Sequence, residues 1–298
     1  MAETFFDQAD GLTKRSFFQT QNNEKAAGLF VKAGHLYKMA GNLTHAGESY
    51  LRASECFEKL GEKYDTTKHL LNASHCFEMV NNLQFTTDAI LKVIKYCEKD
   101  GAFTQAAIQY EKLSEIEPDL QQKIRYLQRA IGYHTYETGQ YTTSRCIKRL
   151  AQLQEENELY HEAIESYETI INMMTDDLAK FMVSNYIYHS LLCYLALGDN
   201  ITTKQALEKY ILTNPSFEKS RECNFVREIC ESIDWGNQRS PHTPQTPKSP
   251  FPLSRQREGN PDRFTQIVQD YDSIRSLTPI EIKILLKVKE NIEEPSLI

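Results

Sequence analysis

Few residues of this sequence are arranged for catalysis or for holding a metal ion. The chain has no Gly-rich loop that could cradle a phosphate, and its eight histidines include no H-x-x-x-H pair. The stretch His161-Glu162-Ala163-Ile164-Glu165 does not match a zinc motif. Serine and threonine are frequent, but no nucleophile elbow surrounds any of them. The sequence therefore predicts a protein that is not an enzyme and that uses no cofactor or metal.

The cysteines also give no sign of a reactive site. There are seven, an odd number, with no C-x-x-C motif and no histidine nearby at ligand spacing. They are Cys56, Cys76, Cys97, Cys146, Cys193, Cys223 and Cys230. Because a free cysteine behaves as a small hydrophobic residue, we expect reduced thiols that pack in the core.

A pattern with a period of 20 residues occurs three times between residues 33 and 81. Each copy has two small residues, an aromatic residue three positions later, and a turn residue four positions after that. The copies begin at Ala33, Ala53 and Ala73 and end at Gly41, Gly61 and Asn81. Small side chains allow a neighbouring helix to come close, and Gly or Asn can take the left-handed conformation that ends a helix. Two copies therefore predict an antiparallel helical hairpin of about 40 residues, as in helical solenoids.

Composition agrees with a folded helical-repeat protein. The 298 residues are 40% hydrophobic and 25% charged, enough for a core between neighbouring repeats. The formal charge of -7 disfavours general nucleic-acid binding. No apolar run approaches the roughly 20 residues of a membrane span, and the first residues do not resemble a signal peptide. We therefore expect a cytosolic protein.

Changes of pattern divide the chain into three predicted regions. Residues 1–23 contain a short helix over residues 2–14 and then a polar loop with two phenylalanines. Residues 24–200 hold the repeats. Residues 201–298 contain further helices, interrupted at 236–261 by a stretch rich in Ser, Thr and Pro that predicts disorder.

Four residues of this Pro-rich stretch directly precede a proline. They are Ser240, Thr243, Thr246 and Ser249. We interpret them as candidate sites of proline-directed phosphorylation, which phosphopeptide mass spectrometry of protein from growing cells would test. Four unmodified residues would indicate a passive spacer.

Two adjacent phenylalanines, Phe17 and Phe18, follow Lys14 and Arg15 in the N-terminal loop. Adjacent rings in a loop cannot both point into one core face. In one interpretation, one ring packs on the next helix. In the other, the rings contact lipid while the two cations meet anionic headgroups.

Basic residues concentrate between residues 123 and 149, where six of them stand against a single acidic residue. They are Lys123, Arg125, Arg129, Arg145, Lys148 and Arg149. Arg125 and Arg129, like Arg145 and Arg149, are four residues apart and so share a helix face. The two pairs are separated by the repeat period of 20 residues. They could form a basic stripe for an acidic partner, or a solvated face whose counter-ions lie on neighbouring helices.

The end of the chain has a recognisable helix start and an acidic tail. Thr278-Pro279-Ile280-Glu281 has the form of a capping box with proline at the first helical position. In the tail, Glu290, Glu293 and Glu294 precede Leu297. An acidic cluster followed by one apolar anchor suits a basic groove with a small hydrophobic pocket.

Taken in order, these features resemble the soluble NSF attachment protein family. The resemblance rests on the Phe-Phe loop, the Ala-small-aromatic repeats, the last helix with its penultimate leucine, and three short stretches. These are Gly101-Ala102-Phe103-Thr104-Gln105-Ala106-Ala107, Ser220-Arg221-Glu222-Cys223 and Tyr271-Asp272-Ser273-Ile274. The similarity covers nearly the whole chain and is closer to the alpha and beta types than to the gamma type.

The resemblance implies a fold, a function and partners. The fold is all-α, a superhelical sheet of antiparallel helical hairpins like those of tetratricopeptide repeats (TPR-like), followed by a C-terminal helical bundle. The function is that of an adaptor which binds four-helix SNARE complexes of the syntaxin type, several copies to each. The adaptor recruits and activates the hexameric ATPase NSF for SNARE disassembly in vesicle fusion and in ER-Golgi and other intracellular transport. It is cytoplasmic and peripherally associated with the cytosolic face of membranes. A generic TPR-like scaffold or co-chaperone is the alternative.

The resemblance also assigns roles to single residues. Phe17 and Phe18 match a membrane-contacting loop. The SNARE-binding set comprises Arg145, Arg149 and Arg221, extended by Arg125, Arg129 and Lys148. The NSF-binding set comprises Leu297, Glu290, Glu293 and Glu294. Ile108 and Ser184 stand where the family has basic residues, which leaves open a specialised or inhibitory isoform.

Overall fold

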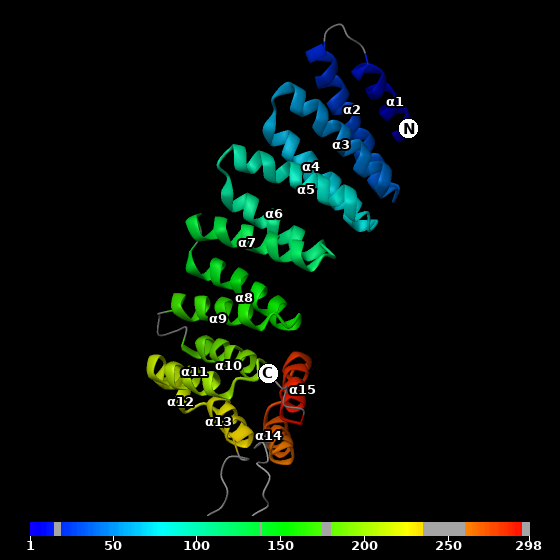
Figure 1. The fold of residues 1–298 in the computed structure, drawn as a ribbon. Coiled ribbons are helices and arrows are strands. Elements are labelled where there is room, and N and C mark those ends of the chain that lie inside the picture. The colour runs from blue at the N-terminus through cyan, green and yellow to red at the C-terminus, as the bar shows by residue number, and fades with distance from the viewer. Residues whose placement is uncertain (15–18, 138, 175–179, 235–259, 294–298) are drawn as a thin grey trace, which may run out of the picture. The chain divides into compact units, whose positions relative to one another are not determined.

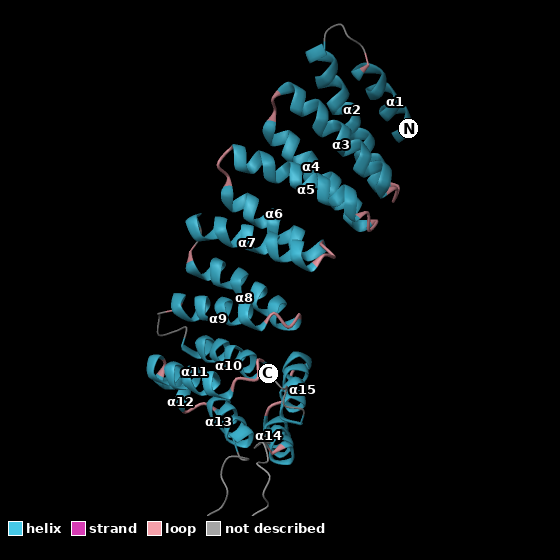
Figure 2. Ribbon diagram, in the orientation of Figure 1, coloured by secondary structure: helices cyan, strands magenta, loops and turns pink. Residues whose placement is uncertain are grey.

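A computed structural model describes residues 1–14, 19–137, 139–174, 180–234 and 260–293. These residues form fifteen α-helices and contain no strand. Short loops join most consecutive helices (Figure 2). The predicted all-α fold class is therefore confirmed.

The chain divides into two compact units, Met1–Cys146 and Ile147–Ile298, which are described separately. The first unit contains α1 (Ala2–Thr13), α2 (Gln19–Met39), α3 (Leu43–Leu60), α4 (Lys63–Met79), α5 (Leu83–Lys99), α6 (Phe103–Ile116), α7 (Leu120–Glu137) and the start of α8 (Gln140–Glu156). From α1 to α7, each helix packs against the next one in the sequence (Figure 1). This arrangement confirms the predicted series of TPR-like helical hairpins.

The repeated turn residues end their helices as the sequence predicts. Gly41, Gly61, Asn81 and Gly101 have φ angles of 76, 78, 56 and 72°, a left-handed conformation that Gly adopts without a steric penalty. After each of them, the next amide donates to the carbonyl five residues earlier, at 2.8–3.0 Å. This is the hydrogen bond of a Schellman motif, which satisfies the carbonyls at a helix end. The sequence period of 20 residues is thus the spacing between successive helix ends.

Close contact between helices explains the small residues. A methyl group added to Gly34 on α2 would lie 2.9 Å from the ring of Tyr50 on α3. One added to Gly47 on α3 would lie 2.8 Å from the ring of Phe77 on α4. Both distances are too short for carbon atoms in contact. Each glycine therefore makes room for an aromatic ring of the following helix.

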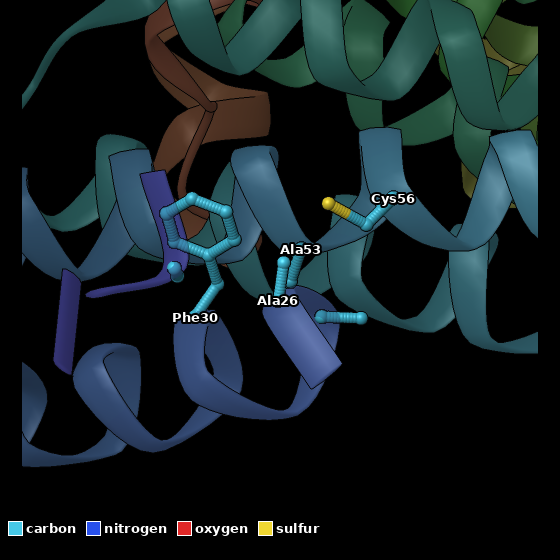
Figure 3. Packing of buried hydrophobic residues seen from close by; sticks show 6 residues of the cluster. Ala26, Phe30, Ala53 and Cys56 are labelled. Carbon is cyan, nitrogen blue, oxygen red and sulfur yellow. The ribbon is translucent and has the colours of Figure 1, made fainter. Parts of the chain in front are cut away.

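The first three helices enclose a core of small residues around one ring. Its buried members are Ala9, Ala26, Ala27, Phe30, Ala53 and Cys56. Figure 3 shows the labelled side chains of Ala26, Phe30, Ala53 and Cys56 meeting between the helices. All seven cysteines are free thiols, and all except the half-buried Cys97 are buried. The prediction of packed, reduced cysteines is confirmed.

The second unit contains the rest of α8, then α9 (Tyr160–Met173), α10 (Lys180–Ala196), α11 (Asn200–Thr213), α12 (Pro215–Glu218), α13 (Arg221–Asp234), α14 (Pro261–Ile274) and α15 (Pro279–Glu293). The central helix α10 packs against α9, α11, α13 and α15, and α14 packs against both α13 and α15. The rings of Phe225 and Tyr271 stack 4.0 Å apart between α13 and α14. These contacts make up the predicted C-terminal helical bundle.

The last helix begins with the predicted capping box. The amide of Thr278 donates to Oε2 of Glu281 at 2.6 Å, and the amide of Glu281 donates to Oγ1 of Thr278 at 3.3 Å. Arg275 adds an ion pair, with Nη1 3.2 Å from Oε1 of the buried Glu281. Two backbone amides at the helix start are therefore satisfied, as this motif requires.

One predicted loop is shorter than expected. The sequence predicts no helix from residue 14 to residue 23, but α2 begins at Gln19. The first turn of α2 carries no apolar residue and its first three residues are exposed, and burial begins only at Asn23, which shares a helix face with the buried Ala26, Ala27 and Phe30. Phe17 and Phe18, the Pro-rich stretch up to residue 259 and the end of the tail lie outside the described residues. The disorder predicted up to residue 261 is wrong for its last two positions, because Asn260 caps α14 and Pro261 begins it. The boundaries predicted at residues 23 and 200 stay predictions.

The close contact at Gly47 predicts an unusual response to alanine. Gly to Ala inside a helix normally stabilises by about 0.5–1 kcal/mol, and Gly28, whose added methyl group would meet no atom within 4 Å, should behave in this way. Gly47→Ala should instead destabilise by about 1–3 kcal/mol, because the buried ring of Phe77 must move. Urea denaturation of the two variants measures the difference. A Gly47→Ala protein as stable as Gly28→Ala would contradict this packing.

Candidate functional site

The described surface carries several of the charged residues that the sequence singled out. Among the residues with described side chains, no group of three or more His, Cys, Asp or Glu could hold a metal ion. Within the same part of the chain, no helix has the length and hydrophobicity needed to span a bilayer. The candidate site residues are the basic residues, the N-terminal loop and the tail that the sequence singled out.

The arginines of α7 lie at the surface of the first unit. Arg125 and Arg129 are exposed one turn apart on this helix. Arg129 borders a pocket of about 660 Å³ between α6 and α7, whose other lining residues are Phe103, Gln128, Gly132, Tyr133 and Tyr136. This places Arg129 beside aromatic side chains.

Arg145 has a different environment, because an acidic partner lies next to it. Its Nη2 is 3.3 Å from Oε2 of Glu111 on α6, while its side chain stays 56% exposed. The other oxygen of Glu111 lies 2.8 Å from Nε2 of the buried His134 on α7. The interpretation in which neighbouring helices supply counter-ions therefore holds for Arg145. Its exposed guanidinium can still meet an external anion.

The remaining basic candidates belong to the second unit. Lys148 and Arg149 are half-buried on α8. Arg221 is exposed at the first position of α13, where the Ser220 hydroxyl accepts from the amide of Cys223 at 3.0 Å and so caps the helix. Because the predicted basic residues are distributed over both units, one continuous stripe stays a prediction.

A buried carboxylate in the second unit was missed by sequence reasoning. Glu155 on α8 accepts a hydrogen bond from the hydroxyl of Tyr167 at 2.7 Å and lies 2.9 Å from Nδ1 of His189. Burial, followed by the charge of Glu155, raises the pKa of both Tyr167 and Cys193 far above their usual ranges. The phenol and the thiol stay protonated, so this cluster joins helices and provides no nucleophile. No local signal marks Glu155, because it stands in a run of polar residues.

Salt bridges fasten the last helix to the loop before α9. Oε2 of Glu158 lies 2.7 Å from Nζ of Lys287, and Oε1 lies 3.0 Å from Nζ of Lys283. The hydrogen bond from Lys287, then that from Lys283, lowers the pKa of Glu158 to about 2. Lys283 also donates to the carbonyl of Glu156 at 3.0 Å. These contacts join residues more than a hundred positions apart, which sequence patterns cannot reveal.

The anchored helix carries part of the predicted tail site. Glu290 and Glu293 are exposed near the end of α15, and Glu293 lies 3.7 Å from Lys289. Glu294 and Leu297 lie beyond the described residues. The packing of α15 therefore determines the position of Glu290 and Glu293, where the acidic tail begins.

Comparison with known proteins identifies the family of this chain. The family model described as soluble NSF attachment protein matches residues 1–242. The chain belongs to the soluble NSF attachment protein family. Its resemblance to this family, first drawn from the sequence, is thus confirmed.

Relatives in the soluble NSF attachment protein family cover most of the chain. The chain is 25% identical over 275 residues to human alpha-soluble NSF attachment protein, covering 91% of this chain and 85% of that protein. It is 25% identical over 292 residues to a vesicular-fusion protein of Komagataella phaffii, covering 94% and 89%. A solved ATPase with a tetratricopeptide repeat sensor from Pyrococcus horikoshii has a TM-score of 0.43 and 14% identity, covering 78% of this chain and 38% of that chain.

Ile108 and Ser184 stand where the family resemblance predicts basic residues, and their side chains differ in exposure. Ile108 on α6 is 45% exposed, so its apolar side chain meets solvent. Ser184 on α10 is half-buried. At both positions the basic charge expected from the resemblance is absent.

The pairs around Glu158 predict how firmly α15 is held. Because the pKa of Glu158 is lowered from 4.5 to about 2, its ion pairs should stabilise the docked helix above about pH 4.5. This contribution should be lost as the pH falls towards 2. Hydrogen exchange in α15, corrected for intrinsic rates, should therefore accelerate over this range. At neutral pH, Glu158→Gln should accelerate it in the same helix.

The control for this experiment is Glu290→Gln, which removes an exposed charge from α15 itself. It should leave exchange in α15 unchanged. Equal exchange in the Glu158→Gln variant and the unmodified protein would show that the ion pairs do not hold the helix.

Proposed function

We propose that this chain is a non-enzymatic adaptor that binds assembled SNARE complexes and recruits and activates the ATPase NSF to take them apart. The family match over residues 1–242 carries this proposal. Relatives named for NSF attachment and for vesicular fusion support it over more than 90% of the chain. The process served is vesicle fusion in intracellular membrane traffic.

The basic residues are the proposed contacts to the SNARE bundle. They are Arg145, Arg149, Arg221, Arg125, Arg129 and Lys148. Cations facing an acidic surface speed association and fix orientation more than they add affinity. Arg145 can reach such a surface while its other side stays near Glu111. Several copies of the adaptor would surround one syntaxin-type bundle.

The C-terminal tail is the proposed contact to the hexameric ATPase. Glu290, Glu293 and Glu294 would meet a basic groove, and Leu297 would fill an apolar pocket. The salt bridges of Lys283 and Lys287 with Glu158 support this role. Because these salt bridges attach α15 to the loop before α9, a force that the ATPase applies to the tail would be transmitted to the rest of the second unit.

The N-terminal loop is the proposed membrane contact. Phe17 and Phe18 would insert at the lipid interface, where a fully buried ring contributes about 1.5–3 kcal/mol. That is enough to concentrate the adaptor at a membrane and too little for permanent anchoring. The proposed location is the cytoplasm, with peripheral association at the cytosolic face of membranes.

Disassembly of a preformed SNARE complex by NSF and ATP tests the proposal directly. With the purified chain present, we expect disassembly and stimulated ATP hydrolysis. Arg221→Glu should weaken binding of the SNARE complex by about tenfold or more at low salt, because attraction becomes repulsion. Its thermal melting should not change, since an exposed charge contributes little to stability.

Lys32→Glu is the matched control, with the same charge change on the exposed surface of α2. It should bind the SNARE complex normally. If no SNARE complex from a panel is disassembled, the adaptor function is wrong. If only the Arg221 effect is missing, the assignment of that contact is wrong.

The loop and the tail should affect different steps. Phe17→Ser with Phe18→Ser should slow disassembly of liposome-anchored SNARE complexes but not of soluble ones. Leu297→Ala should leave SNARE binding intact and slow NSF-driven disassembly of both. Rates measured at limiting NSF separate the two cases. Equal losses on soluble and anchored substrate for the loop variant, or a full rate for the tail variant, would refute the respective role.

A further inference from the structure

The pocket between α6 and α7 is large enough to hold part of a partner. Its volume of about 660 Å³ lies in the range of ligand-binding pockets. Three aromatic rings, those of Phe103, Tyr133 and Tyr136, contribute to its lining together with the guanidinium of Arg129. Tyrosine and arginine are enriched at protein interfaces, where they often supply most of the binding energy.

One wall of the pocket is rigid before anything binds. The rings of Phe103 and Tyr133 stack with their centroids 5.3 Å apart. The hydroxyl of Tyr133 donates to Oε1 of Glu98 at 2.6 Å, and the hydroxyl of Tyr110 donates to the same oxygen at 3.2 Å. Burial and then Glu98 raise the pKa of Tyr133 to about 12, so its hydroxyl remains a donor. A preformed wall lowers the entropy cost of binding.

Gly132 keeps the pocket open. It lies inside α7, where glycine costs about 0.5–1 kcal/mol relative to alanine. Unlike Gly34 and Gly47, it is not required by packing, because a methyl group added there would meet no atom within 4 Å. A side chain at this position would instead project into the pocket that Gly132 lines.

The charge around the pocket favours an acidic occupant. Arg125 and Arg129 are exposed one turn apart on α7, whereas the nearby carboxylate of Glu98 already accepts hydrogen bonds from the hydroxyls of Tyr110 and Tyr133. Tyr136 is 89% exposed at the pocket. A guanidinium binds carboxylates in a bidentate way. With a single cation in the pocket and a chain charge of -7, a polyanion such as nucleic acid is disfavoured.

We propose that this pocket docks an acidic segment of a partner protein. One apolar side chain of that segment enters above Gly132 between the aromatic rings, and a neighbouring carboxylate pairs with Arg129. This site rests on the proposed adaptor function, because Arg129 is one of the proposed SNARE contacts, and it adds a pocket for one apolar side chain of the acidic partner. It requires neither Arg145 nor the C-terminal tail, so loss of peptide binding and loss of SNARE disassembly are separate outcomes.

A labelled peptide tests this site without SNAREs or NSF. The probe is a fluorescent peptide of about 12 residues, long enough to cover the pocket, in which one Phe is flanked by Glu residues. Its fluorescence anisotropy is measured as protein is added up to about 1 mM. We expect saturable binding to the full chain. A peptide with Lys in place of each Glu should not bind. Gly132→Leu and Arg129→Glu should each weaken binding of the acidic peptide at least about fivefold.

Two further variants make the result interpretable. Gly28→Leu is the matched control, since Gly28 is also an exposed helical glycine with open space, and it should bind the peptide normally. Tyr136→Ser removes an exposed ring without disturbing the core and should weaken binding. Failure of the acidic peptide to bind, equal binding of the Lys peptide, or unchanged binding in Gly132→Leu and Tyr136→Ser would overturn the proposal.

Discussion

The fold of the first unit depends on contacts between an aromatic ring and a residue with no side chain on the preceding helix. At Gly34 and Gly47 the backbone of one helix lies directly against Tyr50 and Phe77. A ring packed this closely limits both the distance and the rotation of the two helices, because protein interiors are close-packed and leave the ring little room to move. The fully buried Ala53 and Ala73 belong, respectively, to the core cluster that contains Phe30 and to the one that contains Tyr50 and Phe77. The surface residues of each helix are therefore held in fixed positions by what lies beneath them.

Buried carboxylates add a second, polar constraint. Glu111 lies between His134 and Arg145, and Glu155 between Tyr167 and His189. A buried charge is tolerated only with such partners, and these partners come from different helices. Each carboxylate therefore specifies which helices must meet. Glu111 also pairs with Arg145, which is one of the proposed SNARE contacts.

Sequence patterns predicted correctly the features that depend on a few adjacent residues, such as helix ends and caps. The turns at Gly41, Gly61 and Asn81 and the capping box at Thr278 depend on a few adjacent residues, so their chemistry can be read directly. The start of α2 was predicted incorrectly because its first turn is polar and mostly exposed, so no apolar spacing marks it as helical. The ion pairs of Glu158 and the pocket at Gly132 depend on residues that are distant in sequence. A glycine that preserves an opening and a glycine that admits a ring look identical in a sequence.

The bundle at the end of the chain also has a topological consequence. The amide of Asn260, just before α14, donates to the carbonyl of Ser232 on α13 at 3.0 Å, so the chain re-enters the bundle where it left. Closing a longer loop between fixed ends costs only about 0.6 kcal/mol for each doubling of its length. The number of residues between these two points can therefore change with little effect on the free energy of folding, while α13 and α14 stay paired.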